Sequence, residues 1–211
     1  YSSGVVQKIV DKMVPLGLTF DDDGSIVCMQ FNSKVNMCDD ITLENYENYV
    51  NECMQSPYSG TNYSPALKEI KRQFFEEGGT KVKKKQGFFS KLFGKKSKEE
   101  APVESVKTAD VNECPVFVLF VTDGGCDMSD ERATDAIVRE LSNNMCFIQF
   151  LGSSDYSSED FRYLKSLDDL SGREFDNTGF VRFDDIEHVS DEELYNIMLE
   201  KYAEWLKAKG F

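Results

Sequence analysis

The segment Cys114–Val121 reads CPVFVLFV, and Thr122-Asp123-Gly124-Gly125 follows it directly. An almost unbroken apolar run rich in valine and phenylalanine is typical of a strand that is buried on both faces of a parallel sheet. We expect this strand to run through the centre of a sheet. It would deliver the carboxylate of Asp123 at its carboxyl end.

On both sides of this segment, expected strands alternate with expected helices. The other expected strands cover Ser25–Phe31, Lys34–Met37, Met145–Leu151 (MCFIQFL) and Phe180–Phe183. The expected helices cover Gly4–Thr19, Leu43–Cys53 capped by Thr42, a run from about Pro65 to Phe75, Asp130–Asn143 capped by Ser129, about Glu159–Leu167, and a C-terminal helix opened by Ser190. This alternation predicts an α/β fold with a doubly wound, mostly parallel sheet flanked by helices, in a single domain over residues 1–211.

One segment, 81–110, breaks the pattern and is interpreted as a lysine-rich inserted loop. Its first twenty residues hold eight lysines against two glutamates, whereas the whole chain has 24 basic and 38 acidic residues and a net charge of −14. Large apolar residues at positions 88, 89, 92 and 93 lie among those lysines. Two interpretations stay open: a flexible, solubilising loop, or a segment over 81–98 that contacts an anionic membrane surface or an acidic partner.

Composition excludes several function classes. The acidic balance argues against a nucleic-acid partner, because phosphate contacts need a basic surface. No apolar run is long enough to span a bilayer, and the N-terminus lacks the pattern of a secretory signal, so we expect a cytoplasmic protein. The cysteines include no CxxC pair and are expected to be small buried hydrophobes in a reducing compartment; they are Cys28, Cys38, Cys53, Cys114, Cys126 and Cys146.

Few residues suggest catalysis. His188 is the single histidine and is expected to lie at the surface, with no nucleophile elbow to pair with it. The acidic runs at 21–23 and 184–185 lack the alternating ligands of a calcium loop and are expected to be solvated. No glycine-rich phosphate-binding signature occurs. We therefore expect a protein that is not an enzyme.

Several stretches together carry a family resemblance. They are GVVQKIVDKMVPLGLTFDDDG, ITLENYENYV, GTNYSPALKEI, VFVLFVTDGG, FDNTGFVRFDDI and SDEELYNIMLEKYAEWLK. With these stretches the chain resembles the von Willebrand factor A (vWA) family, in the branch associated with bacterial tellurium-resistance and stress proteins. The metal-ion-dependent adhesion site (MIDAS) of this family uses an Asp-x-Ser-x-Ser loop, a threonine from a second loop and an aspartate after a central strand. The resemblance implies that Thr61 and Asp123 are the last two of these ligands.

The resemblance also implies what is missing. The Asp-x-Ser-x-Ser loop and the first strand should precede a helix like the one expected at Gly4, and Tyr1-Ser2-Ser3 does not reproduce them. The site in these residues is therefore expected to be incomplete, and the domain to lack its first strand. From spacing alone, Thr61 could equally be a turn hydroxyl and Asp123 a cap.

The function that the resemblance implies is a metal-ion-dependent protein-interaction module in a bacterial stress or tellurium-resistance system. Mg²⁺, or alternatively Mn²⁺, would be the cofactor, and a partner protein would present a carboxylate to it. The alternative is an adaptor subunit for an AAA-type ATPase or chelatase-like complex. A hydrolase is disfavoured, because no nucleophile and base can be identified.

Overall fold

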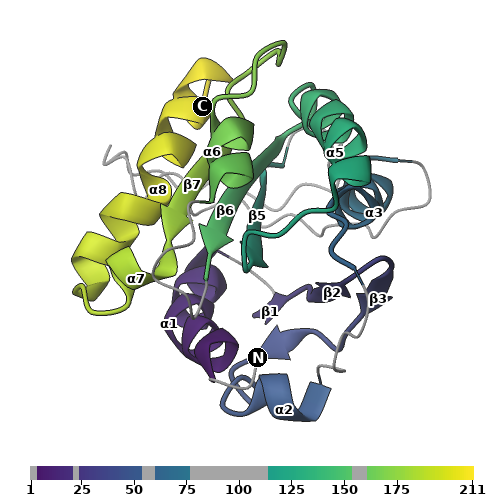
Figure 1. Ribbon diagram of the computed structural model, residues 1–211. Helices are drawn as coiled ribbons and strands as arrows, with labels where there is room; N and C mark the ends of the chain where they lie inside the picture. The colour runs from purple at the N-terminus through teal and green to yellow at the C-terminus, as the bar shows by residue number, and fades with distance from the viewer. Residues whose placement is uncertain (1–3, 21–23, 54–59, 77–113, 154–160) are drawn as a thin grey trace, which may run out of the picture.

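The computed structural model describes residues 4–20, 24–53, 60–76, 114–153 and 161–211 (Figure 1). Its elements follow in the order α1 (Val5–Phe20), β1 (Ser25–Ile26), β2 (Met29–Phe31), β3 (Val35–Met37), β4 (Ile41–Thr42), α2 (Tyr49–Cys53), α3 (Ser64–Phe75), β5 (Val116–Thr122), α5 (Met128–Leu141), β6 (Cys146–Gly152), α6 (Arg162–Asp168), β7 (Thr178–Arg182), α7 (Phe183–Ile186) and α8 (Asp191–Ala208). The alternation of strands and helices confirms the α/β class. The acidic run at 21–23, the inserted loop over 81–110 and the first residues of the helix expected from about Glu159 lie outside the described residues.

The main sheet is parallel and has the strand order β5-β6-β7. Val116 pairs with Cys146, and the register continues to Thr122 opposite Gly152. Every residue of β6 is buried, whereas most of β5 is only half-buried. Among the described strands β5 is thus an edge and β6 the centre, so the expected central position of Cys114–Val121 is not the observed one. Both segments are highly apolar, so hydropathy alone does not show which of the two strands lies at the centre of the sheet.

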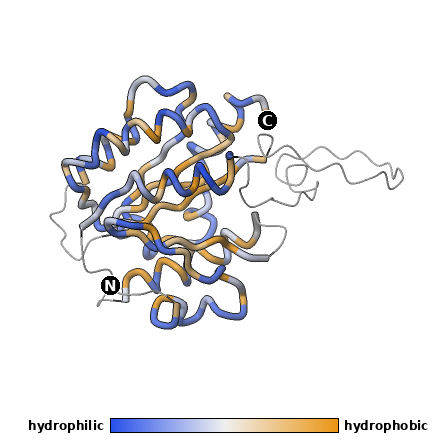
Figure 2. Tube along the Cα trace, turned by 90° about the vertical axis from the view of Figure 1, so that its right-hand side faces the viewer, coloured by the Kyte–Doolittle hydropathy of each residue, from blue (hydrophilic) through white to orange (hydrophobic). Residues whose placement is uncertain are grey.

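Helices cover both faces of the parallel sheet (Figure 1). Alternate side chains of β5 and β6, including Phe120, Ile148 and Phe150, pack with α3, α5 and α6. The opposite set, including Leu119 and Leu151, packs with α1, α7 and α8. Figure 2 shows the resulting arrangement, with apolar segments gathered inside and hydrophilic ones along the outer helices. The result is a three-layer α/β/α arrangement that places the strand ends between two helical layers.

The N-terminal strands do not join this sheet. β1 pairs with β4 and β2 pairs with β3, both antiparallel, in two separate two-stranded sheets. The described strands therefore do not form one continuous doubly wound sheet. The expected single strand over Ser25–Phe31 is wrong in detail, because it breaks at Val27 and Cys28 and its halves pair with different partners. Its second half, β2, pairs with β3, which lies within the strand expected over Lys34–Met37.

Of the four helix starts predicted from a named capping residue or a proline, two agree with the structure. Ser190 caps α8, with its hydroxyl accepting a hydrogen bond from the Glu193 N–H at 3.3 Å. Pro65 lies in the first turn of α3 as expected. Two caps were wrong: α5 begins at Met128, before Ser129, and Thr42 belongs to β4 rather than to a helix. In the described part of the chain, no helix is both long enough and apolar enough to cross a membrane.

Candidate functional site

Thr61 lies in the loop that leads into α3, and Asp123 lies directly after the last residue of β5. Thr61 is partly buried, while Asp123 is exposed. The Asp123 carboxylate accepts a hydrogen bond from the Gly125 N–H at 3.2 Å, across a turn in which Gly124 has a φ of +93°. This positive φ favours glycine, so the Gly-Gly pair suits the turn that presents the carboxylate to solvent.

The two loops lie side by side. The Asp127 N–H, in the loop after β5, donates to the Thr61 carbonyl oxygen at 2.9 Å. One residue after Asn62, the buried Tyr63 hydroxyl lies 2.9 Å from the Thr122 hydroxyl at the end of β5. The chain thus brings together the loops that carry Thr61 and Asp123, although they are about sixty residues apart in sequence.

The donors on these loops have the chemistry of a hard-cation site, but they are few. A threonine hydroxyl and an aspartate carboxylate suit Mg²⁺, which takes about six oxygens and keeps several waters. Asn62 adds a side-chain oxygen, Oδ1, that is buried without a hydrogen-bond partner. Among the described residues, no group of three or more His, Cys, Asp or Glu side chains could hold a metal ion. The described part of the chain therefore supplies oxygens of the right kind without a complete metal shell.

Comparison with known proteins identifies the family. The family model vWA-TerF-like, described as the vWA found in the TerF C terminus, matches residues 1–210. The chain belongs to the vWA-TerF-like family. It is also 24% identical over 212 residues to a Bacillus subtilis (strain 168) protein named "Uncharacterized protein YcbR", in an alignment that covers 98% of this chain and 71% of that protein. Membership of this family links the domain to tellurium resistance.

A second carboxylate of the vWA-TerF-like domain lies close to the Thr61 loop. Asp127 Oδ2 is 3.2 Å from the point where a Cβ on Gly60 would lie. Asp127 is the N-cap residue of α5, yet its side chain makes no capping hydrogen bond, and the residue is exposed. Sequence reasoning did not single it out. The available signal was its position four residues after Asp123, at the start of the next helix.

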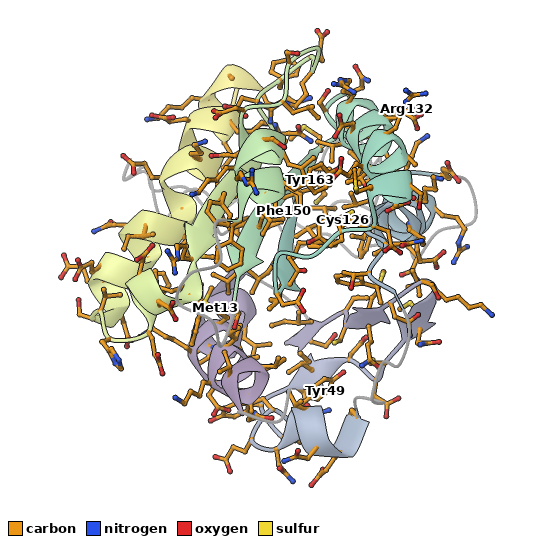
Figure 3. The ribbon with its side chains drawn as sticks, in the orientation of Figure 1. Met13, Tyr49, Cys126, Arg132, Phe150 and Tyr163 are labelled. Atoms are coloured by element: carbon orange, nitrogen blue, oxygen red, sulfur yellow. The ribbon has the colours of Figure 1, made fainter. Side chains whose placement is uncertain are left out.

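Cys126 and His188 of the vWA-TerF-like domain have side chains of types that are common in catalysis. Burial raises the pKa of the Cys126 thiol to about 11, so this cysteine stays protonated at neutral pH. Figure 3 shows Cys126 on the loop that enters α5, near Tyr163 of α6. The His188 side chain is 87% exposed, which confirms the expected surface position. All six cysteines are free, and two of them, Cys28 and Cys146, are buried while the other four are partly buried, so the expectation of burial holds for two.

Proposed function

We propose that this vWA-TerF-like domain is a metal-ion-dependent protein-interaction module in a bacterial stress or tellurium-resistance system. The observation that supports it is the contact between the Thr61 loop and the loop after β5, through the Asp127 N–H and the Thr61 carbonyl oxygen at 2.9 Å. This contact brings an oxygen-donor loop to the carboxyl end of a parallel strand. Ligands of open α/β sheets bind at that end of the strands.

In this proposal Thr61 contributes its hydroxyl, and Asp123 contributes its carboxylate directly or through water. A bound Mg²⁺ or Mn²⁺ supplies positive charge and an open coordination position for a carboxylate of the partner protein. Met128, at the first position of α5, is 87% exposed and offers an apolar contact beside the same loop. A carboxylate next to an apolar side chain is the partner feature that this surface would fit.

We also propose that the domain binds rather than catalyses. The support is chemical: the Cys126 thiol near the candidate site is held in its protonated form, and the exposed His188 lies 3.8 Å from Glu187, which is not a nucleophile. A hydrolase needs an activated nucleophile within hydrogen-bond reach of a base. Turnover of generic ester or phosphate substrates would contradict this proposal.

The experiment is a calorimetric titration of the intact protein with Mg²⁺ and Mn²⁺, repeated on Asp123→Ala. We expect the variant to lose most of its metal affinity. Its thermal unfolding should be nearly unchanged, within about 0.5 kcal/mol, because Asp123 is exposed. Asp185→Ala, an exposed acid of α7, is the matched control and should bind metal as the wild type does. Equal affinity in wild type and Asp123→Ala would refute the metal assignment.

A further inference from the structure

Asp130 is a buried carboxylate with an unusual set of partners. It lies in the first turn of α5 and is 7% exposed. Its Oδ2 accepts from the Ser64 N–H at 2.9 Å and from the Thr134 hydroxyl at 3.0 Å, and its Oδ1 accepts from the Ser64 hydroxyl at 2.5 Å. Three donors from two helices therefore converge on one buried anion.

One of these bonds caps α3 from outside, and a second ties the Ser64 hydroxyl to the same carboxylate. The N-cap residue of α3, Tyr63, makes no side-chain capping hydrogen bond. The first backbone N–H of that helix, that of Ser64, is satisfied by Asp130 instead. A carboxylate at a helix N-terminus is favoured both by the free N–H groups and by the helix dipole. The capping group of α3 thus comes from α5, 66 residues away in sequence.

This cap lies next to the candidate site. Ser64 is three residues after Thr61, and Asp130 is three residues after Asp127, whose N–H donates to the Thr61 carbonyl. The same pair of segments is therefore linked twice, once through backbone atoms at 127 and 61 and once through the Asp130 side chain at 64. Two linkages at this spacing fix both the separation and the orientation of the Thr61 loop relative to the loop that carries Asp123.

We propose that Asp130 is a positioning residue, which holds the Thr61 loop in its place against the loop after β5 by capping α3. The expected effect of Asp130 on metal affinity rests on the proposed function, whereas its expected effect on the Thr61 loop does not. Residues behind the direct ligands orient them in many metal sites, and their loss costs about 10- to 100-fold in affinity.

The test compares variants that remove different donors to the same carboxylate. Asp130→Asn weakens both bonds to Ser64, and Ser64→Ala removes the hydroxyl bond while the backbone bond stays. Thr134→Val is the matched control, because it also deletes a buried hydroxyl bonded to Asp130 but leaves α3 capped. Amide hydrogen exchange is measured at Asn62, whose N–H donates to the Asn32 carbonyl at 3.0 Å, together with Mg²⁺ titration.

We expect faster exchange at the Asn62 amide in Asp130→Asn and, to a smaller extent, in Ser64→Ala, with no change in Thr134→Val. In Asp130→Asn we expect Mg²⁺ affinity to fall by at least about tenfold. If Thr134→Val and Ser64→Ala accelerate the exchange equally, Asp130 stabilises the core without positioning the loop. If Asp130→Asn does not fold, the difference in Asn62 exchange between Ser64→Ala and Thr134→Val still tests the positioning role. Failure of the wild type to bind Mg²⁺ would refute the proposed function, while the exchange comparison would still test the positioning role.

Discussion

At the residue scale, the pKa values of two carboxylates, those of Asp130 and Asp168, are shifted in opposite directions. Burial opposes ionisation of Asp130, but the hydrogen bonds from Ser64 and Thr134 outweigh it and hold the pKa of Asp130 below its usual value. For Asp168 at the end of α6, burial outweighs the contact with Lys201 at 2.7 Å and raises its pKa. Asp130 receives several hydrogen bonds, whereas Asp168 has the contact with Lys201 and is also repelled by the charges of Asp169 and Asp176.

These opposite shifts predict opposite pH dependences. Stability from Asp130 is present above the ordinary aspartate pKa of 3.8 and is lost as the pH falls through its lowered value. Asp130→Asn should therefore cost about 1 to 3 kcal/mol at pH 7, because it leaves buried donors unsatisfied, and less near pH 3. The measurement is urea unfolding at both pH values.

Asp168→Asn is the matched comparison. A carboxylate whose folded pKa is raised contributes stability below its unfolded pKa and loses it as the pH rises through the folded value. The cost of Asp168→Asn should therefore not shrink in acid. A cost of Asp130→Asn that is independent of pH would show that the ionised carboxylate is not the stabilising form.

At the element scale, local signals in the sequence predicted some helix starts correctly and others wrongly, and they did not predict which elements pack together. Ser190 precedes Asp-Glu-Glu, and its hydroxyl needs only the backbone three residues ahead, so this cap is visible in the sequence. Thr42 looks similar, but the Asn45 side chain accepts its N–H at 2.8 Å, and the chain turns instead of forming a helix. The capping of α3 by Asp130 depends on the packing of two helices, which periodicity does not encode.

The same limit applies to the candidate site. The family resemblance implied that Thr61 and Asp123 belong to one site, and the loops that carry them are in contact. Their role as metal ligands stays a prediction. Asp127 and Asp130 were not singled out, because an acidic chain offers many carboxylates and only the tertiary contacts distinguish these two.

The end of β6 provides an element-scale prediction. A Cβ on Gly152 would lie 2.7 Å from the ring of Phe161, the residue that precedes α6. Gly152→Ala should therefore destabilise the protein by about 1 to 3 kcal/mol through overpacking. In a Phe161→Leu background the cost of the alanine should be smaller, because the ring is gone. Thermal unfolding of the four proteins in this double-mutant cycle is the measurement, and equal costs in the two backgrounds would exclude this contact as the cause.

At the scale of the whole molecule, charge is distributed unevenly along the chain. The lysine-rich segment 81–98 lies outside the described residues, and its proposed role rests on sequence alone. Outside this segment, acidic residues outnumber basic ones. An anionic surface would therefore attract this segment far more than the rest of the chain. Peripheral contact with an anionic membrane, or with an acidic protein, is accordingly our proposal for it.

Deletion of residues 81–98 tests that proposal. We expect nearly unchanged stability, because loop length alters closure entropy by only about 0.6 kcal/mol per doubling. Binding to anionic liposomes should disappear in the deletion variant and weaken with added salt in the intact protein. Replacement of the eight lysines by glutamine controls for loop length. An intact protein that ignores anionic liposomes at low salt would contradict the membrane role, and unfolding of the deletion variant would show that the segment belongs to the core.

The links between the Thr61 loop and the end of β5 also determine how the molecule would respond to mechanical force. A partner that pulls on this site would load β5 along its own axis, through the Tyr63–Thr122 contact and the loop that follows. Such a load shears the parallel register that joins Val116–Thr122 to Cys146–Gly152, so its hydrogen bonds share the force instead of breaking one after another. A pull along the axis of β5 would therefore be resisted by the whole length of the β5–β6 pairing at once.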